Sequence, residues 1–155
     1  MPRLEIAMSR EEALEFLGSE RTGVLATIGP RGFPHLAAMR YVLVSGRIEF
    51  LTFRKAQKVI NITRNPRAAF LVDSGDNYDT LRGVRVEGNA NLRDDRERVV
   101  AIRHELLTRY PEDGVEETPE MSAVMERQAA KQIVVSLPIE RMSSWDHRRS
   151  AGLRS

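Results

Sequence analysis

Residues 48–72, IEFLTFRKAQKVINITRNPRAAFLV, constrain the fold more than any other stretch of this chain. Apolar and β-branched residues at both ends of the stretch predict two strands, over 47–53 and 67–72. Between them a basic loop leads into a short helix, which we expect over 55–64. The helix must stop there, because Pro66 disfavours a helical conformation in the residue before it. The pattern therefore predicts a strand that runs directly into the N-terminus of a helix.

The loop in this stretch carries an unusual concentration of lysine. The chain has three lysines among its 24 basic residues, and two of them, Lys55 and Lys58, lie here beside Thr52 and Arg54. Lysine near a helix N-terminus is unfavourable unless an anion offsets it, since the unpaired N–H groups and the helix dipole already favour negative charge. The same features make such a corner a ready anion site. We predict that this loop holds the phosphate of a flavin-like cofactor.

The rest of the chain supplies further short strands and helices. Ser9 and Glu12 form the pattern of a capping box at the start of a helix over 9–18. Turn signals separate the remaining apolar runs, and an acidic loop precedes a helix that begins at about Thr118. Further strands are expected over 22–28, 35–44, 84–92 and 132–137, and another helix over 94–109. In 84–92, Val84 and Val86 alternate with charged residues, which predicts one buried and one exposed face. This order predicts a small antiparallel barrel with peripheral helices, in which the three strands of 22–53 form a meander.

Length and composition narrow the function. The 155 residues are expected to form one domain over 1–155, with a C-terminal tail at 139–155. A net charge of +2, with acids spread among the bases, argues against a nucleic-acid partner. The chain has no cysteine, its three histidines lack ligand spacing, and no segment resembles a signal peptide or membrane span. We expect a cytoplasmic protein with no metal site and no membrane partner.

Three segments together resemble the pyridoxamine 5′-phosphate oxidase-like superfamily of flavin- and deazaflavin-binding proteins. They are TGVLATIGPRGFPHLAAMRYVL at 22–43, LTFRKAQKVINITRNPRAAFLV at 51–72 and YDTLRGVRVEGNANL at 78–92. The closing VVSLPIERMSSWDHRR is similar to the branch that uses the deazaflavin coenzyme F420. The resemblance implies a mainly β fold with flanking α-helices: a split antiparallel β-barrel, FMN-binding-like. It also implies a homodimer with cofactor sites at the subunit interface.

The resemblance also implies roles for individual positions. Thr52, Lys55 and Lys58 match the family's phosphate-binding loop, and Arg54 would help to bind the phosphate. The backbone of 36–39 matches the strand that lies against the cofactor ring. Gln57 departs from the oxidase pattern, in which an arginine usually precedes the matched lysine; this weakens the case for FMN-dependent pyridoxamine phosphate oxidation. The loop at 78–82 and the tail at 145–148 would approach a partner's cofactor. The cofactor-binding candidates are thus Leu36, Ala37, Ala38, Met39, Thr52, Arg54, Lys55, Lys58, Tyr78, Arg82, Trp145 and Arg148.

The resulting hypothesis is an F420-dependent oxidoreductase that transfers a hydride to or from a small electron-poor organic substrate. A bound flavin or deazaflavin supplies the hydride chemistry, so the protein needs no nucleophile of its own, and none stands out in the sequence. Candidates for a catalytic proton donor are His35, Tyr78 and His147. Two alternatives remain open: an FMN-dependent reductase or oxidase of the same fold, and a non-catalytic flavin or F420 carrier.

Overall fold

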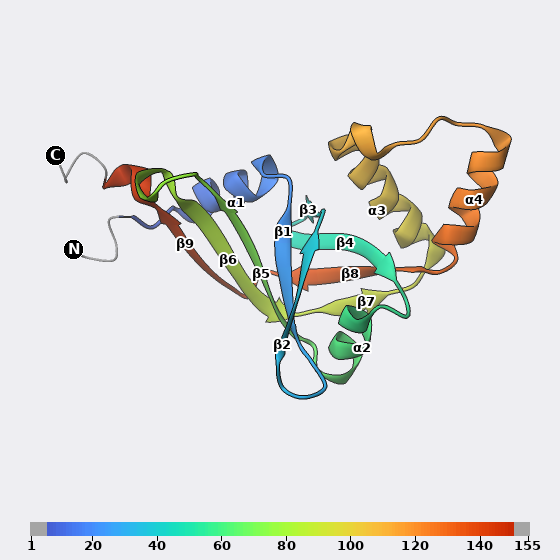
Figure 1. Ribbon diagram of the computed structural model, residues 1–155, viewed down its shortest axis with the longest axis horizontal. Coiled ribbons are helices and arrows are strands. Elements are labelled where there is room, and N and C mark those ends of the chain that lie inside the picture. The colour runs from blue at the N-terminus through green and yellow to red at the C-terminus, as the bar shows by residue number, and fades with distance from the viewer. Residues whose placement is uncertain (1–5, 151–155) are drawn as a thin grey trace.

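The computed structural model describes residues 6–150 (Figure 1). Within these residues the strands form two antiparallel sheets. The five-stranded sheet has the order β2-β1-β5-β6-β9, and the four-stranded sheet has the order β3-β4-β8-β7. The first comprises β1 (Gly23–Ile28), β2 (Pro34–Met39), β5 (Arg67–Ser74), β6 (Arg82–Asn89) and β9 (Arg141–Asp146). The second comprises β3 (Val42–Val44), β4 (Arg47–Phe53), β7 (Asn91–Arg93) and β8 (Gln132–Pro138).

Helices close the open sides of the two sheets. They are α1 (Arg10–Ser19), α2 (Gln57–Arg64), α3 (Arg96–Arg109) and α4 (Pro119–Ala129). The predicted capping box at the start of α1 is present, with the Ser9 side chain accepting from the Glu12 amide. Helix α3 packs on the outer face of the four-stranded sheet through Val99 and Ile102, while α4 stands farther out (Figure 1). No helix in the described part of the chain is long and apolar enough to cross a bilayer.

The core lies between the inner faces of the two sheets. The alternation predicted for β6 is confirmed, since Val84 and Val86 are buried and the intervening Arg85 is exposed. Strand β4 contributes Ile48 and Phe50 from the opposite sheet. Helix α1 adds three buried side chains at one end of this core: Ala13, Phe16 and Leu17.

Two predicted strands are in fact pairs of strands, and this corrects the expected topology. The run at 35–44 breaks after Met39, so that β2 pairs with β1 in one sheet and β3 pairs with β4 in the other. The three segments over 22–53 therefore do not form a meander. The Tyr41 hydroxyl donates to the Leu17 carbonyl at 2.6 Å, which fixes the chain where it passes between the sheets. The run at 84–92 divides in the same way into β6 and β7.

The C-terminal segment is more ordered than a tail. Residues 141–146 form β9 beside β6, a strand that the sequence did not predict, and a short 3-10 helix, η4 (His147–Arg149), follows. The last part of the predicted tail, 151–155, lies outside the described residues, as does 1–5 at the other end of the expected domain.

The two sheets approach each other closely where the chain passes from β6 into β7. At the shared side β6 runs close to β8, and a Cβ at Gly88 would collide with the carbonyl oxygen of Pro138. A glycine is therefore needed for this close approach. The predicted split antiparallel β-barrel with flanking helices is confirmed.

Candidate functional site

The predicted phosphate loop lies where β4 ends and α2 begins. The Ala56 amide donates to the Phe53 carbonyl at 3.0 Å, which turns the chain sharply after the strand. Ala56 is the N-cap of α2, and no side chain caps the helix. The amides of Gln57 and Lys58, in the first turn, have no hydrogen-bond acceptor among the described residues. This end of α2 thus retains the donors that an anion would accept from.

All three lysines of the chain gather at this corner. Lys55 is exposed and Lys58 half-buried, in the turn and the first helical turn. The third, Lys131, precedes β8, and its carbonyl accepts from the Arg54 amide at 2.9 Å. Within residues 6–150 none of the three ammonium groups has an ion pair or hydrogen bond. Arg54 differs, because its guanidinium pairs with Asp94 at 3.3 Å.

Lys131 was missed by the sequence analysis, although a signal for it existed. Lysine is rare in this chain, so a third lysine at the edge of an apolar run was as unusual as the first two. Its position became evident only from the strand register, in which Phe53 at the end of β4 faces Gln132 at the start of β8.

A polar chain in the interior fixes α2 to the barrel. The side-chain Nε2 of Gln57 donates to Asn61 Oδ1 at 2.8 Å, and Asn61 Nδ2 donates to Thr27 Oγ1 at 3.1 Å. Asn61 is fully buried and Thr27 nearly so. Ile60, an apolar residue of this helix, is 48% exposed, and Asn61 takes the inward place. Gln57 is hydrogen-bonded one turn farther along the helix.

The predicted ring-binding strand is β2, at the edge of the five-stranded sheet. Among the described strands it pairs only with β1, so one of its backbone edges is not used by the sheet. Leu36 and Ala38 are exposed, while Ala37 and Met39 are half-buried. His35 faces Thr27 across the strand pair, and its Nδ1 atom is buried without a hydrogen-bond partner. A buried nitrogen without a partner is uncommon in a folded protein, which marks His35 as a candidate functional side chain.

The remaining predicted residues form a second cluster on β6, β9 and the segments beside them. The Tyr78 and His147 rings meet edge to face with centroids 4.5 Å apart, and the His147 amide donates to the Leu81 carbonyl at 2.8 Å. Trp145 lies over Gly83, where a Cβ would strike the indole. These contacts bring the loop at 78–82 against the tail.

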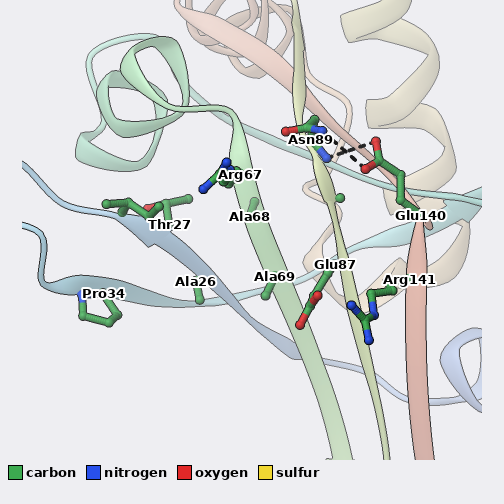
Figure 2. Close-up of a pocket in the computed structure, with 12 residues that line it drawn as sticks. Ala26, Thr27, Pro34, Arg67, Ala68, Ala69, Glu87, Asn89, Glu140 and Arg141 are labelled. Atoms are coloured by element: carbon green, nitrogen blue, oxygen red, sulfur yellow. Dashed lines mark hydrogen bonds between the residues drawn. The ribbon is translucent and has the colours of Figure 1, made fainter.

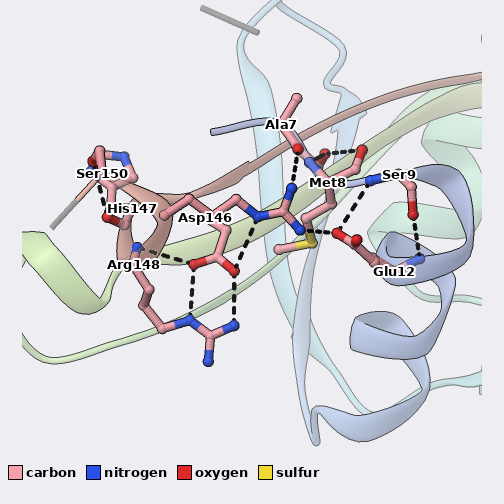
Figure 3. A network of polar contacts seen from close by, with 10 residues as sticks. Ala7, Met8, Ser9, Glu12, Asp146, His147, Arg148 and Ser150 are labelled. Atoms are coloured by element: carbon pink, nitrogen blue, oxygen red, sulfur yellow. Dashed lines mark hydrogen bonds and ion pairs between the residues drawn. The ribbon is translucent and has the colours of Figure 1, made fainter. Parts of the chain in front are cut away.

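The charged members of this second cluster already have partners within the chain. Arg148 binds Asp146 through two hydrogen bonds, of 2.9 and 2.8 Å (Figure 3). This bond lowers the pKa of the buried Asp146 carboxyl below its ordinary value, although burial itself acts in the opposite direction. Arg82 lies 3.9 Å from Glu20 and over the ring of Phe16.

The two clusters lie far apart in one chain. The lysine corner lies where β4 meets α2, whereas the second cluster lies beside the β9 edge, well away from α2 (Figure 1). Thus the structure brings together Thr52, Arg54, Lys55 and Lys58 around one corner, with β2 at a sheet edge, and separately groups Tyr78, Arg82, Trp145, His147 and Arg148.

The outer face of the five-stranded sheet is hollowed, apolar over β2, β1 and β5 and charged over β6 and β9. Leu36 is 65% exposed and Leu71 is 37% exposed on this face. A hollow of about 480 Å³ lies over the alanines of β1 and β5, with Glu87 and Arg141 at its rim (Figure 2). An exposed apolar face of this kind commonly marks an interaction surface.

This combination of a split barrel, an uncapped basic corner and an open edge strand defines a class of cofactor-binding β proteins. The family model of pyridoxamine 5′-phosphate oxidase matches residues 9–145. The chain belongs to this family. No curated protein matches it in a direct sequence comparison.

Solved structures extend the comparison. The chain is 40% identical to the conserved hypothetical protein Rv2991 from Mycobacterium tuberculosis, with a TM-score of 0.83, over 96% of this chain and 91% of that one. It is 26% identical to an F420 reductase, with a TM-score of 0.68, over 87% of this chain and 98% of the other. A FAD-binding protein from Mesorhizobium loti shares the fold at 18% identity and a TM-score of 0.67, over 89% and 94% of the two chains.

Proposed function

We propose that this protein is an F420-dependent oxidoreductase that acts on a small electron-poor organic substrate. The observation that carries the proposal is the corner of unpaired lysines at the uncapped N-terminus of α2. In a chain where arginines form the described ion pairs, leaving positive charge unpaired at a helix N-terminus is unfavourable unless an anion binds there. The similarity to an F420 reductase supports deazaflavin over FMN.

The residues of this chain would bind and orient the cofactor, which supplies the hydride chemistry when bound. Lys58 and the first amides of α2 would hold its phosphate, with Thr52 and Lys55 beside them. The free edge of β2 offers backbone donors and acceptors to the ring along 36–39. His35, with its unsatisfied Nδ1 at the start of that strand, is the candidate on this side of the site for holding or donating a proton.

We further propose that the active form is a homodimer. Each chain carries two groups of candidate residues, the lysine corner between β4 and α2 and the second cluster beside the β9 edge, and it exposes the outer face of the five-stranded sheet, which is apolar over β1, β2 and β5. Pairing two copies through this face would allow the second cluster of one copy to approach the lysine corner of the other. Tyr78, Trp145, His147 and Arg148 would then complete a site that neither copy contains alone.

Cofactor titration tests the proposal directly. Purified protein is titrated with F420 and with FMN, and ligand fluorescence is followed. We expect micromolar binding of F420 and much weaker binding of FMN. Lys58→Ala should weaken F420 binding by about 1–3 kcal/mol, the cost of losing a charged hydrogen bond. Arg10→Ala is the matched control, because it removes an exposed cation from the first residue of α1, a helix whose end is already capped by Ser9.

Each alternative has a distinct outcome. Tighter binding of FMN than of F420, reduced equally by Lys58→Ala, would favour the FMN-dependent enzyme. Tight F420 binding without turnover of any electron-poor acceptor would favour a carrier. Unchanged affinity in Lys58→Ala would reject the lysine corner as the phosphate site. For the dimer, light scattering should show two copies, and Leu71→Glu on the outer face of β5 should yield monomers while the exposed control Ile60→Glu does not; a wild-type monomer would refute it.

A further inference from the structure

Helices α3 and α4 enclose a cavity that is separate from both clusters described above. Its volume is about 440 Å³, and a second hollow of about 340 Å³ continues from it over Leu51 on the outer face of the four-stranded sheet. Leu107, Val115 and Met125 line both hollows, so the two form one continuous groove. A space of this size lies in the range of small-molecule pockets.

The groove is lined by apolar side chains that the fold itself leaves uncovered. No residue of α4 is buried, although Met121 and Met125 face the cavity. Val100 on α3 is 50% exposed and Val115 on the loop before α4 is 49% exposed. Methionine is flexible and polarizable, and it is common at surfaces that accommodate varied apolar ligands.

The walls are held by polar contacts outside the apolar lining. Arg103 of α3 donates to the Met125 carbonyl of α4 at 3.0 Å and also hydrogen-bonds the Gln132 side chain at the start of β8. Arg96 pairs with Glu126 across the two helices. The separation of α3 and α4 is thus fixed without filling the space between them.

The rim of the groove is acidic, and two of its carboxylates are not neutralised. Glu112 and Asp113, at the start of the loop, pair with arginines of the barrel. Glu116 and Glu117 line the cavity, and within the described residues neither side-chain carboxylate has an ion pair or hydrogen bond. Both arginines in the groove lining are already engaged by oxygen partners. The charge at the mouth therefore complements a cationic ligand.

We propose that the α3–α4 groove binds an amphiphilic organic cation, with its apolar body between Met121, Met125 and Val115 and its charged head at Glu116 and Glu117. The two parts of the ligand match the two parts of the site: an uncovered apolar interior and an unpaired acidic rim. This site requires no cofactor and does not depend on the lysine corner.

The test uses three eight-carbon probes that differ in their head group: octyltrimethylammonium, octanol and octanoate. Binding to the full-length, cofactor-free protein is measured by calorimetry below the micelle concentration. Methyl-labelled methionine reports the location by NMR, because Met121 and Met125 line the groove while Met8 and Met142 lie elsewhere. We expect the cation to bind about tenfold more tightly than the anion, a ratio within reach of two exposed carboxylates, and to shift only the first two signals.

Paired variants make the outcome decisive. Glu116→Gln with Glu117→Gln should abolish the preference for the cation and leave octanol binding unchanged, while the exposed Glu105→Gln on α3 should change neither. Equal affinity for cation and anion would overturn the head-group assignment. Shifts of Met8 or Met142 instead, no binding of any probe, or concentration-dependent dimerisation that buries Met121 and Met125 would overturn the proposal as a whole.

Discussion

The buried Gln57–Asn61–Thr27 chain should control how firmly α2, and with it the lysine corner, is held on the barrel. Asn61→Leu removes two hydrogen bonds, of 2.8 and 3.1 Å. Gln57 is exposed and can hydrogen-bond water instead, but Thr27 is 2% exposed and its hydroxyl loses its donor inside the barrel. A buried polar group without a partner costs about 1–3 kcal/mol, and each lost bond contributes about 0.5–1.5 kcal/mol.

The expected loss for Asn61→Leu is therefore about 2–3 kcal/mol in the free energy of unfolding. For a chain of this length that lowers Tm by about 5–10 °C. Urea unfolding followed by circular dichroism measures the free energy, and the F420 titration measures the effect on the corner. The affinity for F420 should fall together with the free energy of unfolding, because the first turn of α2 is no longer hydrogen-bonded to β1 through Asn61.

Thr27→Val separates the hydrogen bond from the packing. In the double variant, Asn61→Leu with Thr27→Val, both polar groups are gone and no hydroxyl is left unsatisfied. We expect its loss in the free energy of unfolding to be smaller than the sum of the two single losses by at least about 1 kcal/mol. Additive single and double effects, or an Asn61→Leu cost below about 0.5 kcal/mol, would refute the view that this chain anchors the helix.

Three further predictions concern other polar groups. Arg98→Met leaves Glu49, which is 1% exposed, as an unpaired buried carboxylate and should lower the free energy of unfolding in urea by about 3–5 kcal/mol. Adding Glu49→Met in the same chain should restore stability, and failure to do so would contradict this explanation. Arg148 lowers the pKa of Asp146, so the stability that this pair contributes is complete above the unfolded-state pKa near 3.8 and is lost as pH falls through the lower folded-state value. Asp146→Asn should therefore reduce the fall in the free energy of unfolding at acid pH. An unchanged acid dependence would exclude this role of the pair. Lys131→Ala should weaken F420 binding by about threefold in the same titration, which is less than the effect of Lys58→Ala, because its ammonium group would face the bound anion without contacting it. A loss of affinity equal to that of Lys58→Ala would show that Lys131 is a direct ligand.

Sequence patterns predicted the elements well where one face is buried and local signals are strong. The alternation in β6, the Ser9–Glu12 capping box and the stop of α2 before Pro66 are local features, and each was correct within a residue or two. The lysine corner also followed from local chemistry, because a helix N-terminus and nearby cations are adjacent in the sequence.

The errors arose where long-range geometry decides. Residues 35–44 are all compatible with a strand, and only the crossing from one sheet to the other at Tyr41 divides them into β2 and β3. Strand β9 was missed because MSSW carries little apolar alternation and is stabilised by its pairing with β6. Asn61 is buried because Thr27, 34 positions earlier, offers a partner at the point where the helix docks.

The separation of the two candidate clusters is the feature that connects this fold to its function. The resemblance places the loop at 78–82 and the tail at 145–148 beside a partner's cofactor, and in the single chain these segments form a cluster apart from the lysine corner. Both statements hold together if the site is assembled from two copies, because a twofold arrangement across the apolar outer face brings one end of each sheet to the other end of its partner. The dimer would then be a condition for catalysis and not only for stability. A monomeric Leu71→Glu variant should consequently retain part of the phosphate affinity supplied by Lys58 while losing turnover, and a fully active monomer would show that the β9 cluster has no part in the site.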